Sequence, residues 1–169
     1  MKKIIILVIC LLAFNTQADE NKVSYSIDIG KSKDDIKIYR LGIQHDISDW
    51  LGKKGFTVPV YIESSINYWK STNHDIYAIA LSPVFKFLLC EQCDSAPYFE
   101  LGVGVSLISR KKFGTRDMSS HFQFEDRIGI GFNRNDIDYH LRYMHYSNAG
   151  LAQPNDGIDI FIAGVAVKF

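Results

Sequence analysis

The 169-residue chain has no net charge, little cysteine and no long apolar run. Its 19 Lys and Arg residues balance 19 Asp and Glu residues, which argues against a nucleic-acid partner, because binding to phosphate backbones depends on an excess of basic groups. No apolar run reaches the roughly 20 residues that a membrane-spanning helix needs. The chain also lacks a long stretch with a helical apolar period, so a helical fold is not expected.

The N-terminal segment is typical of a secretory signal peptide, residues 1–18. Lys2 and Lys3 precede an uncharged apolar segment, residues 4–14, and small residues then occupy the two positions that a signal peptidase reads. We expect residues 19–169 to form the mature protein, a length that suits one domain. An uncleaved anchor is the alternative.

Cysteine occurs three times, and Cys10 leaves with the signal segment. The other two, Cys90 and Cys93, would meet an oxidising compartment after export, which favours a local disulfide over a redox motif. A zinc site would need two further ligands at matching spacing, and none is evident. The sequence therefore predicts a Cys90–Cys93 disulfide in a turn, and neither a metal nor a cofactor.

The mature chain alternates apolar and polar residues in segments separated by polar turns, as β-strands do. The expected strands are residues 23–29, 36–45, 57–69, 75–89, 97–109, 121–132, 136–147 and 158–169. One parity of these segments is apolar throughout. Such a pattern suits either a soluble β-sandwich or a transmembrane β-barrel.

The opposite parity decides between these two folds. It carries small residues together with acids and bases in equal number: Asp28, Glu63, Glu100, Glu125 and Asp138 against Arg40, Lys86, Arg127, Arg142 and Lys168. Buried charges must be paired, so this balance indicates a closed interior. We predict an all-β fold, an eight-stranded antiparallel transmembrane β-barrel, with the charges inside, the apolar rows facing lipid and no pore.

Three residues with catalytic chemistry gather in the last strand pair. His145 and Ser147 share one face of a strand because they are two residues apart, and Asp159 begins the returning strand. All three continue the lipid-facing rows at the external end of the barrel, where polar side chains are costly and functional by default. A Ser, a His and an Asp on one patch form the set that acyl transfer uses. Taken alone, such a Ser-His pair is more often only a surface feature.

The acid has two candidates. We expect Ser147 to lie opposite Asp159, which leaves Asp159 diagonal to His145. A tight hairpin over residues 133–135 would place Asp126 diagonal to His145 on the other side. A bulge that turns Asp126 inward is the alternative for that residue.

The connection between the fifth and sixth expected strands is basic and external. Its side chains Lys111, Lys112 and Arg116 are suited to bind anionic phosphates of a substrate. The alternative is a solvated turn, since polar external loops are usual in barrels of this kind.

Two sequence motifs resemble the lipid A 3-O-deacylase (PagL) family. They are His-Tyr-Ser-Asn-Ala-Gly at residues 145–150 and Gln-Pro-Asn-Asp-Gly-Ile-Asp at residues 153–159, and residues 121–126 are also similar to that family. The terminal Phe169 resembles the C-terminal signature of outer-membrane barrels. The resemblance covers the mature chain in layout and is most specific over residues 121–169.

This resemblance implies a role for each motif residue. Ser147 would be the nucleophile, His145 the general base and Asn148 a contributor to the oxyanion hole. Asp159 stands where the family has Glu and is one methylene shorter, so Asp126 remains the alternative acid.

The resemblance also implies a substrate and a location. The protein would hydrolyse the ester-linked 3-hydroxyacyl chain at the 3-position of lipid A of lipopolysaccharide, from the outer-leaflet side of the outer membrane of a Gram-negative bacterium. A structural or adhesive barrel without catalysis and an outer-membrane phospholipid esterase are the alternatives. A homodimer is left open.

Overall fold

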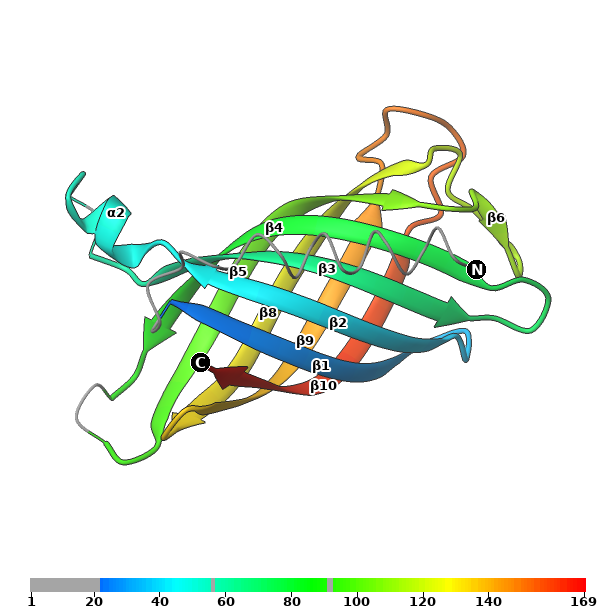
Figure 1. Ribbon diagram of the computed structural model, residues 1–169. Helices are drawn as coiled ribbons and strands as arrows, with labels where there is room; N and C mark the ends of the chain where they lie inside the picture. The colour runs from blue at the N-terminus through cyan, green and yellow to red at the C-terminus, as the bar shows by residue number, and fades with distance from the viewer. Residues whose placement is uncertain (1–21, 56, 91–92) are drawn as a thin grey trace, which may run out of the picture.

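The computed structural model describes residues 22–55, 57–90 and 93–169, and it is a closed antiparallel β-barrel (Figure 1). Its strands are β1 (Val23–Ser32), β2 (Lys37–Asp46), β3 (Val60–Lys70), β4 (Ile76–Leu88), β5 (Ala96–Ile108), β8 (Phe122–Arg134), β9 (Ile137–Ser147) and β10 (Ile158–Lys168). The barrel closes where β1 pairs with β10. The predicted fold class is therefore confirmed, whereas the signal segment predicted at residues 1–18 lies outside the described residues.

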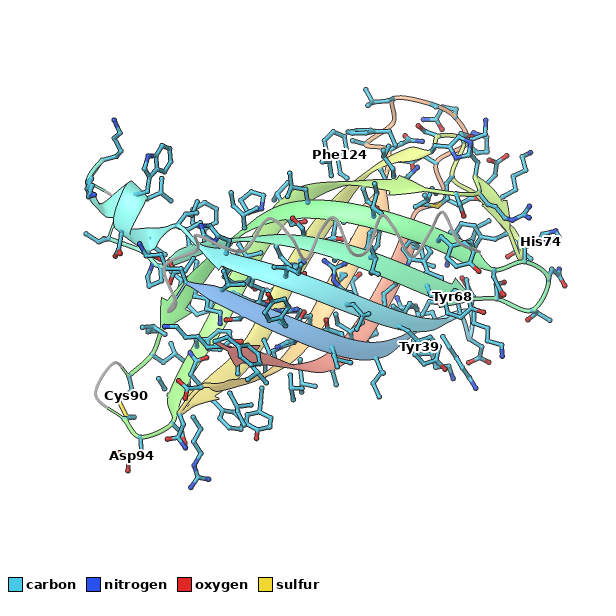
Figure 2. All side chains as sticks on the ribbon, viewed as in Figure 1. Tyr39, Tyr68, His74, Cys90, Asp94 and Phe124 are labelled. Atoms are coloured by element: carbon cyan, nitrogen blue, oxygen red, sulfur yellow. A yellow bond between two sulfur atoms is a disulfide. The ribbon has the colours of Figure 1, made fainter. Side chains whose placement is uncertain are left out.

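Short elements occupy the connections at the two ends of the barrel (Figure 1). Helix α2 (Ser48–Gly52) follows β2, and a small hairpin of β6 (Lys112–Phe113) and β7 (Arg116–Asp117) lies between β5 and β8 at the opposite end. The Cys90–Cys93 disulfide lies in the β4–β5 turn at the α2 end (Figure 2). Among the described residues, no helix is long and apolar enough to cross a membrane.

The outer wall of the barrel is apolar. Its exposed large side chains include Ile27, Ile29, Leu41, Ile79, Leu81, Leu101, Val103, Leu107, Ile128, Ile130, Leu141 and Phe161. A continuous apolar surface of this extent is rare on monomeric soluble proteins. It suits the hydrocarbon of a bilayer, where the closed ladder also leaves no strand edge without hydrogen bonds.

The barrel interior holds a network of paired charges, as the sequence predicted. Glu63 is fully buried and lies 2.6 Å from Arg40 and 2.8 Å from Arg127. Nearby, Arg142 Nε donates to Glu100 Oε1 at 2.6 Å. Each of these charges has a partner of opposite sign, which offsets the cost of removing it from water.

One member of the network, His140, was not singled out from the sequence. Its buried ring lies 2.8 Å from Asp138 through Nδ1 and is bonded to Asp28 through Nε2. Lys86 Nζ donates to the other oxygen of Asp138 at 2.7 Å. Lys168, also predicted inside, lines the open mouth of the barrel with Lys86 and is exposed there because β10 ends at this residue.

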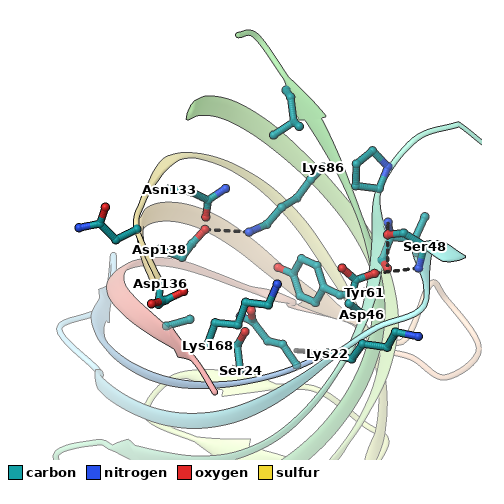
Figure 3. A pocket seen from close by; sticks show the side chains of 16 residues that line it. Lys22, Ser24, Asp46, Ser48, Tyr61, Lys86, Asn133, Asp136, Asp138 and Lys168 are labelled. Atoms are coloured by element: carbon teal, nitrogen blue, oxygen red, sulfur yellow. Dashed lines mark hydrogen bonds and ion pairs between the residues drawn. The ribbon is translucent and has the colours of Figure 1, made fainter. Parts of the chain in front are cut away.

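That mouth is a cavity of about 330 Å³ at the α2 end (Figure 3). The Lys86–Asp138 ion pair lines it together with Tyr61, and Lys86 Nζ lies 5.3 Å from the centre of the Tyr61 ring. Beyond the cavity the charged network fills the interior, as expected for a barrel of this strand number.

Glu63→Gln is expected to lower the free energy of unfolding by about 3–5 kcal/mol, because it leaves buried guanidinium groups without a charged partner. Urea unfolding in lipid vesicles, followed by tryptophan fluorescence, measures the change. Ser64→Ala is the matched control, since Ser64 is the next residue along β3 and faces outward. Equal destabilisation by the two variants would contradict the account of the network.

The register of β8, β9 and β10 differs by two residues from the one predicted. His145 lies directly opposite Asp159 on β10 and directly opposite Asp126 on β8. We had expected Ser147 opposite Asp159 and both aspartates diagonal to His145. The ladder is unbroken at Asp126 on both sides, so no bulge turns it inward.

Turn geometry explains this difference. Arg134 pairs with Ile137, so the β8–β9 turn contains only Asn135 and Asp136, and Asn135 has a φ of 54° that suits a tight hairpin. The turn is shorter than the one predicted. Between β9 and β10 the long connection, residues 148–157, imposes no register of its own, so the strand ladder sets it.

Candidate active site

The candidate site lies on the outer wall at the β6 end, where β9 meets β10. His145 and Asp159 are direct cross-strand neighbours, and Nδ1 of His145 lies 2.8 Å from Oδ1 of Asp159. An ionised carboxylate only accepts hydrogen bonds, so Nδ1 carries the proton and donates it. In the neutral tautomer that this hydrogen bond favours, Nε2 of His145 keeps its lone pair, which is what a general base requires.

Two further side chains hold Asp159, and neither was expected from the sequence. The hydroxyl of Tyr143 donates to Oδ1 of Asp159 at 2.7 Å. Nζ of Lys33, in the β1–β2 turn, lies 3.7 Å from Oδ2. Tyr143 shares the parity of His145 two residues earlier, which is the signal that could have found it; Lys33 comes from a distant turn and had none.

Ser147 lies two residues along β9 from His145, on the same outward face and half-exposed. Its hydroxyl makes no hydrogen bond within the described parts of the chain, and it is directly opposite Phe124 of β8. The rings of Phe122 and Phe124 meet edge to face at 5.2 Å beside it, and Phe124 marks this region in Figure 2. The nucleophile candidate is therefore bordered by aromatic, lipid-facing surface.

Asp126 flanks His145 from the other side. It is directly opposite His145 on β8 and is half-exposed on the outer wall. Among the residues that the structure describes, its carboxylate has no hydrogen bond or ion pair. The geometry therefore brings His145 together with Asp159 and leaves Asp126 as an unpaired neighbour.

Asn148 is buried and organises the connection between β9 and β10. Its Nδ2 donates to the carbonyls of Met118 at 2.8 Å and Ala152 at 3.0 Å, and its Oδ1 accepts from the Gly150 N–H at 2.9 Å. Its own N–H donates to Oδ1 of Asn155. Both donor hydrogens of the side-chain amide are thus engaged by loop carbonyls.

The predicted basic loop forms the β6–β7 hairpin, and two of its cations are paired. Lys112 Nζ lies 2.7 Å from Asp117, and hydrogen bonds from Lys112 and from the Ser119 N–H lower the pKa of the Asp117 carboxyl. Arg116 pairs with Asp34 of the β1–β2 turn.

Comparison with known proteins bears on this arrangement. The family model for lipid A 3-O-deacylase (PagL) matches residues 37–168. The chain is a member of that family. It is 31% identical over 166 residues to lipid A deacylase PagL of Pseudomonas aeruginosa, covering 95% of each chain. To lipid A deacylase PagL of Bordetella bronchiseptica it is 38% identical over 106 residues, which cover 58% of this chain and 56% of that protein.

A solved structure of a PagL protein agrees with the fold. The crystal structure of the outer membrane enzyme PagL matches with a TM-score of 0.77 and 26% sequence identity, over 86% of this chain and 99% of that chain. The family resemblance stated from the sequence is therefore confirmed. This PagL family member is an outer-membrane barrel, and its apolar outer wall is the surface that faces lipid.

No group of three or more potential metal ligands is found among the residues described for this PagL family member. The cavity in Figure 3 lies at the opposite end of the barrel from His145 and shares no residue with the candidate site. Ser147, His145 and Asp159 lie instead on the outer wall of the barrel.

Proposed function

We propose that this protein is a lipid A 3-O-deacylase that hydrolyses the ester-linked 3-hydroxyacyl chain at the 3-position of lipid A. One observation carries the proposal: a His145–Asp159 hydrogen bond lies beside Ser147 on the lipid-facing wall of a PagL family barrel. A buried site would serve a soluble ester. A site on the outer wall serves a substrate whose acyl chains already lie in the membrane.

The mechanism follows from the roles of the three side chains. The hydroxyl oxygen of Ser147 attacks the ester carbonyl while Nε2 of His145 takes its proton. Collapse of the tetrahedral intermediate breaks the bond to the sugar oxygen, which receives that proton from His145. Water then attacks the acyl-enzyme with His145 again as base, and the products are 3-O-deacylated lipid A and a free 3-hydroxy fatty acid.

Asp159 orients His145 and stabilises the imidazolium that forms in each half-reaction. The family resemblance implies Glu at this position, and Asp159 is one methylene shorter. Its place directly opposite His145 removes the need for the longer side chain, and the Tyr143 hydroxyl donates to the same oxygen as His145. We therefore assign the acid to Asp159 rather than to Asp126.

The oxyanion hole is assigned to the turn that follows Ser147. Asn148 contributes by holding this turn, because direct donation by its side chain would require Nδ2 to leave the carbonyl of Met118 or Ala152. A backbone N–H of the turn would then face the developing oxyanion. Of the basic residues proposed to meet the lipid A phosphates, Lys111 is exposed, whereas Lys112 and Arg116 already bind carboxylates.

The purified barrel, refolded in detergent, tests the proposed function when it is incubated with lipid A. We expect release of one 3-hydroxy fatty acid per lipid A, identified by gas chromatography and mass spectrometry, with fragmentation placing the lost chain at the 3-position. Phospholipid in the same micelles is the control and should remain intact. Phospholipid hydrolysis would instead indicate a phospholipid esterase, and no release from either lipid would indicate a structural barrel.

A further inference from the structure

The imidazole of His145 borders the space that a side chain at Gly157 would occupy. A Cβ built on Gly157 would be 3.0 Å from Cε1 of His145 and 3.4 Å from Nε2, and the residue has a φ of 57°. A side chain at this position would have to displace the ring, and the positive φ would add backbone strain. The lack of a side chain at Gly157 therefore leaves room for the edge of the ring that carries Nε2.

An arginine from another connection binds the backbone at this position. Nη1 of Arg116 donates to the carbonyl oxygen of Gly157 and, at 3.1 Å, to that of Asp156. Nε of the same guanidinium pairs with Asp34 in the β1–β2 turn. One planar, permanently charged group thus joins three connections at this end of the barrel, a task for which its fixed donor geometry is suited.

Two further hydrogen bonds hold the same segment next to Arg116. The N–H of Asp117 donates to Oδ2 of Asp156 at 2.6 Å, and the N–H of Asp156 donates back to the carbonyl of Asp117 at 3.3 Å. The β6–β7 hairpin therefore binds Asp156 and Gly157, the two residues of the β9–β10 connection that immediately precede β10.

We infer that Arg116 is a positioning residue: through Asp34 and the carbonyl of Gly157, it holds the Gly157 backbone against His145. The inference rests on the proposed role of His145 as general base. It also changes the role of Arg116 from phosphate binding to positioning, because its guanidinium already binds a carboxylate and two carbonyls.

Asp34 separates this role from phosphate binding. If Arg116 bound a lipid A phosphate, Asp34→Asn would remove a competing negative charge and lower KM or leave it unchanged. If Arg116 instead positions the β9–β10 connection, Asp34→Asn weakens the hold on Arg116 and lowers kcat. We expect kcat to fall by about 10- to 100-fold in Arg116→Ala, as small misplacements of catalytic groups do. The fall should be smaller in Asp34→Asn and in Arg116→Lys, and KM should stay within about twofold in all three.

Gly157→Ala tests the contact itself. Gly55→Ala is its control, since Gly55 also has a positive φ, 89°, but nothing lies within 4 Å of its Cβ position. Gly157→Ala should lower kcat by about 10-fold or more, and Gly55→Ala should leave it unchanged. Equal losses in the two variants would overturn the contact as the cause. All variants are first checked for the heat-modifiable gel mobility of a folded barrel.

A readout without substrate completes the experiment. In protein with ¹⁵N-labelled histidine, the Nδ1–H of His145 should give a resonance typical of a proton shared with Asp159, assigned by its loss in His145→Gln. If Arg116 has this positioning role, Arg116→Ala shifts or broadens the resonance and Gly55→Ala does not. An unchanged resonance together with a raised KM in Arg116→Ala would overturn the proposal and return Arg116 to phosphate binding. If the wild-type protein does not act on lipid A but the resonance responds to Arg116→Ala, the proposed function fails and the positioning role stands.

Discussion

Ser147→Ala is expected to reduce the turnover of lipid A by about 10⁴-fold or more, because loss of a triad nucleophile leaves only binding and the oxyanion hole to act. His145→Ala should cost about as much, since residues that act as one unit lose their effect together. Release of the 3-hydroxy fatty acid by the refolded barrel measures both variants.

The barrel should survive these changes. Ser147 and His145 face outward, away from the interior charges, and neither supports the network around Glu63. Ser64→Ala, which removes another outward-facing serine, is the control and should keep full activity. Near wild-type turnover in Ser147→Ala, with the barrel folded, would show that the nucleophile is wrongly assigned.

Asp159→Ala is expected to lower turnover by about 10²-fold or more, as loss of the orienting acid does in other triads. The effect should be smaller than that of Ser147→Ala, because the acid acts only through His145. Asp159→Glu should retain much of the activity, since it keeps a carboxylate beside His145 on a side chain only one methylene longer.

Asp126→Ala is the matched comparison, because both aspartates lie directly opposite His145 on its two neighbouring strands. Only Asp159 is hydrogen-bonded to the ring, at 2.8 Å. We therefore expect Asp126→Ala to cost less than Asp159→Ala on the same substrate. If Asp126→Ala is the more damaging of the two, His145 is oriented from β8 and the assignment of Asp159 is wrong.

The barrel could be predicted from the sequence because alternation specifies it strand by strand. The apolar parity and the balanced charges of the other parity, such as Glu63 with Arg40, require one lipid-facing wall and one closed interior. The register could not be predicted in the same way. A shift of two residues keeps every side chain on its face, so the alternation was satisfied equally well by Ser147 or His145 opposite Asp159.

The site residues on strands could also be predicted from the sequence, whereas the contacts made in the connections could not. Ser147, His145 and Asp159 lie on strands whose parity could be followed, and the structure places them on one face. The contacts of Arg116 and Asn148 arise in connections, where no periodicity links a residue to its partners. Arg116 was expected to bind phosphate and Asn148 to contribute to the oxyanion hole; the contacts that could not be expected are those of both side chains with loop carbonyls.

The most direct test of the lipid-facing Ser147 site is mass spectrometry of lipid A from Gram-negative cells that produce either the wild-type protein or Ser147→Ala at equal levels of folded, outer-membrane barrel. The account predicts that wild-type cells yield lipid A lighter by one 3-hydroxyacyl chain, lost from the 3-position, and that Ser147→Ala cells yield lipid A identical to that of cells without the protein. Deacylated lipid A in the Ser147→Ala cells, or unchanged lipid A in the wild-type cells, would contradict it.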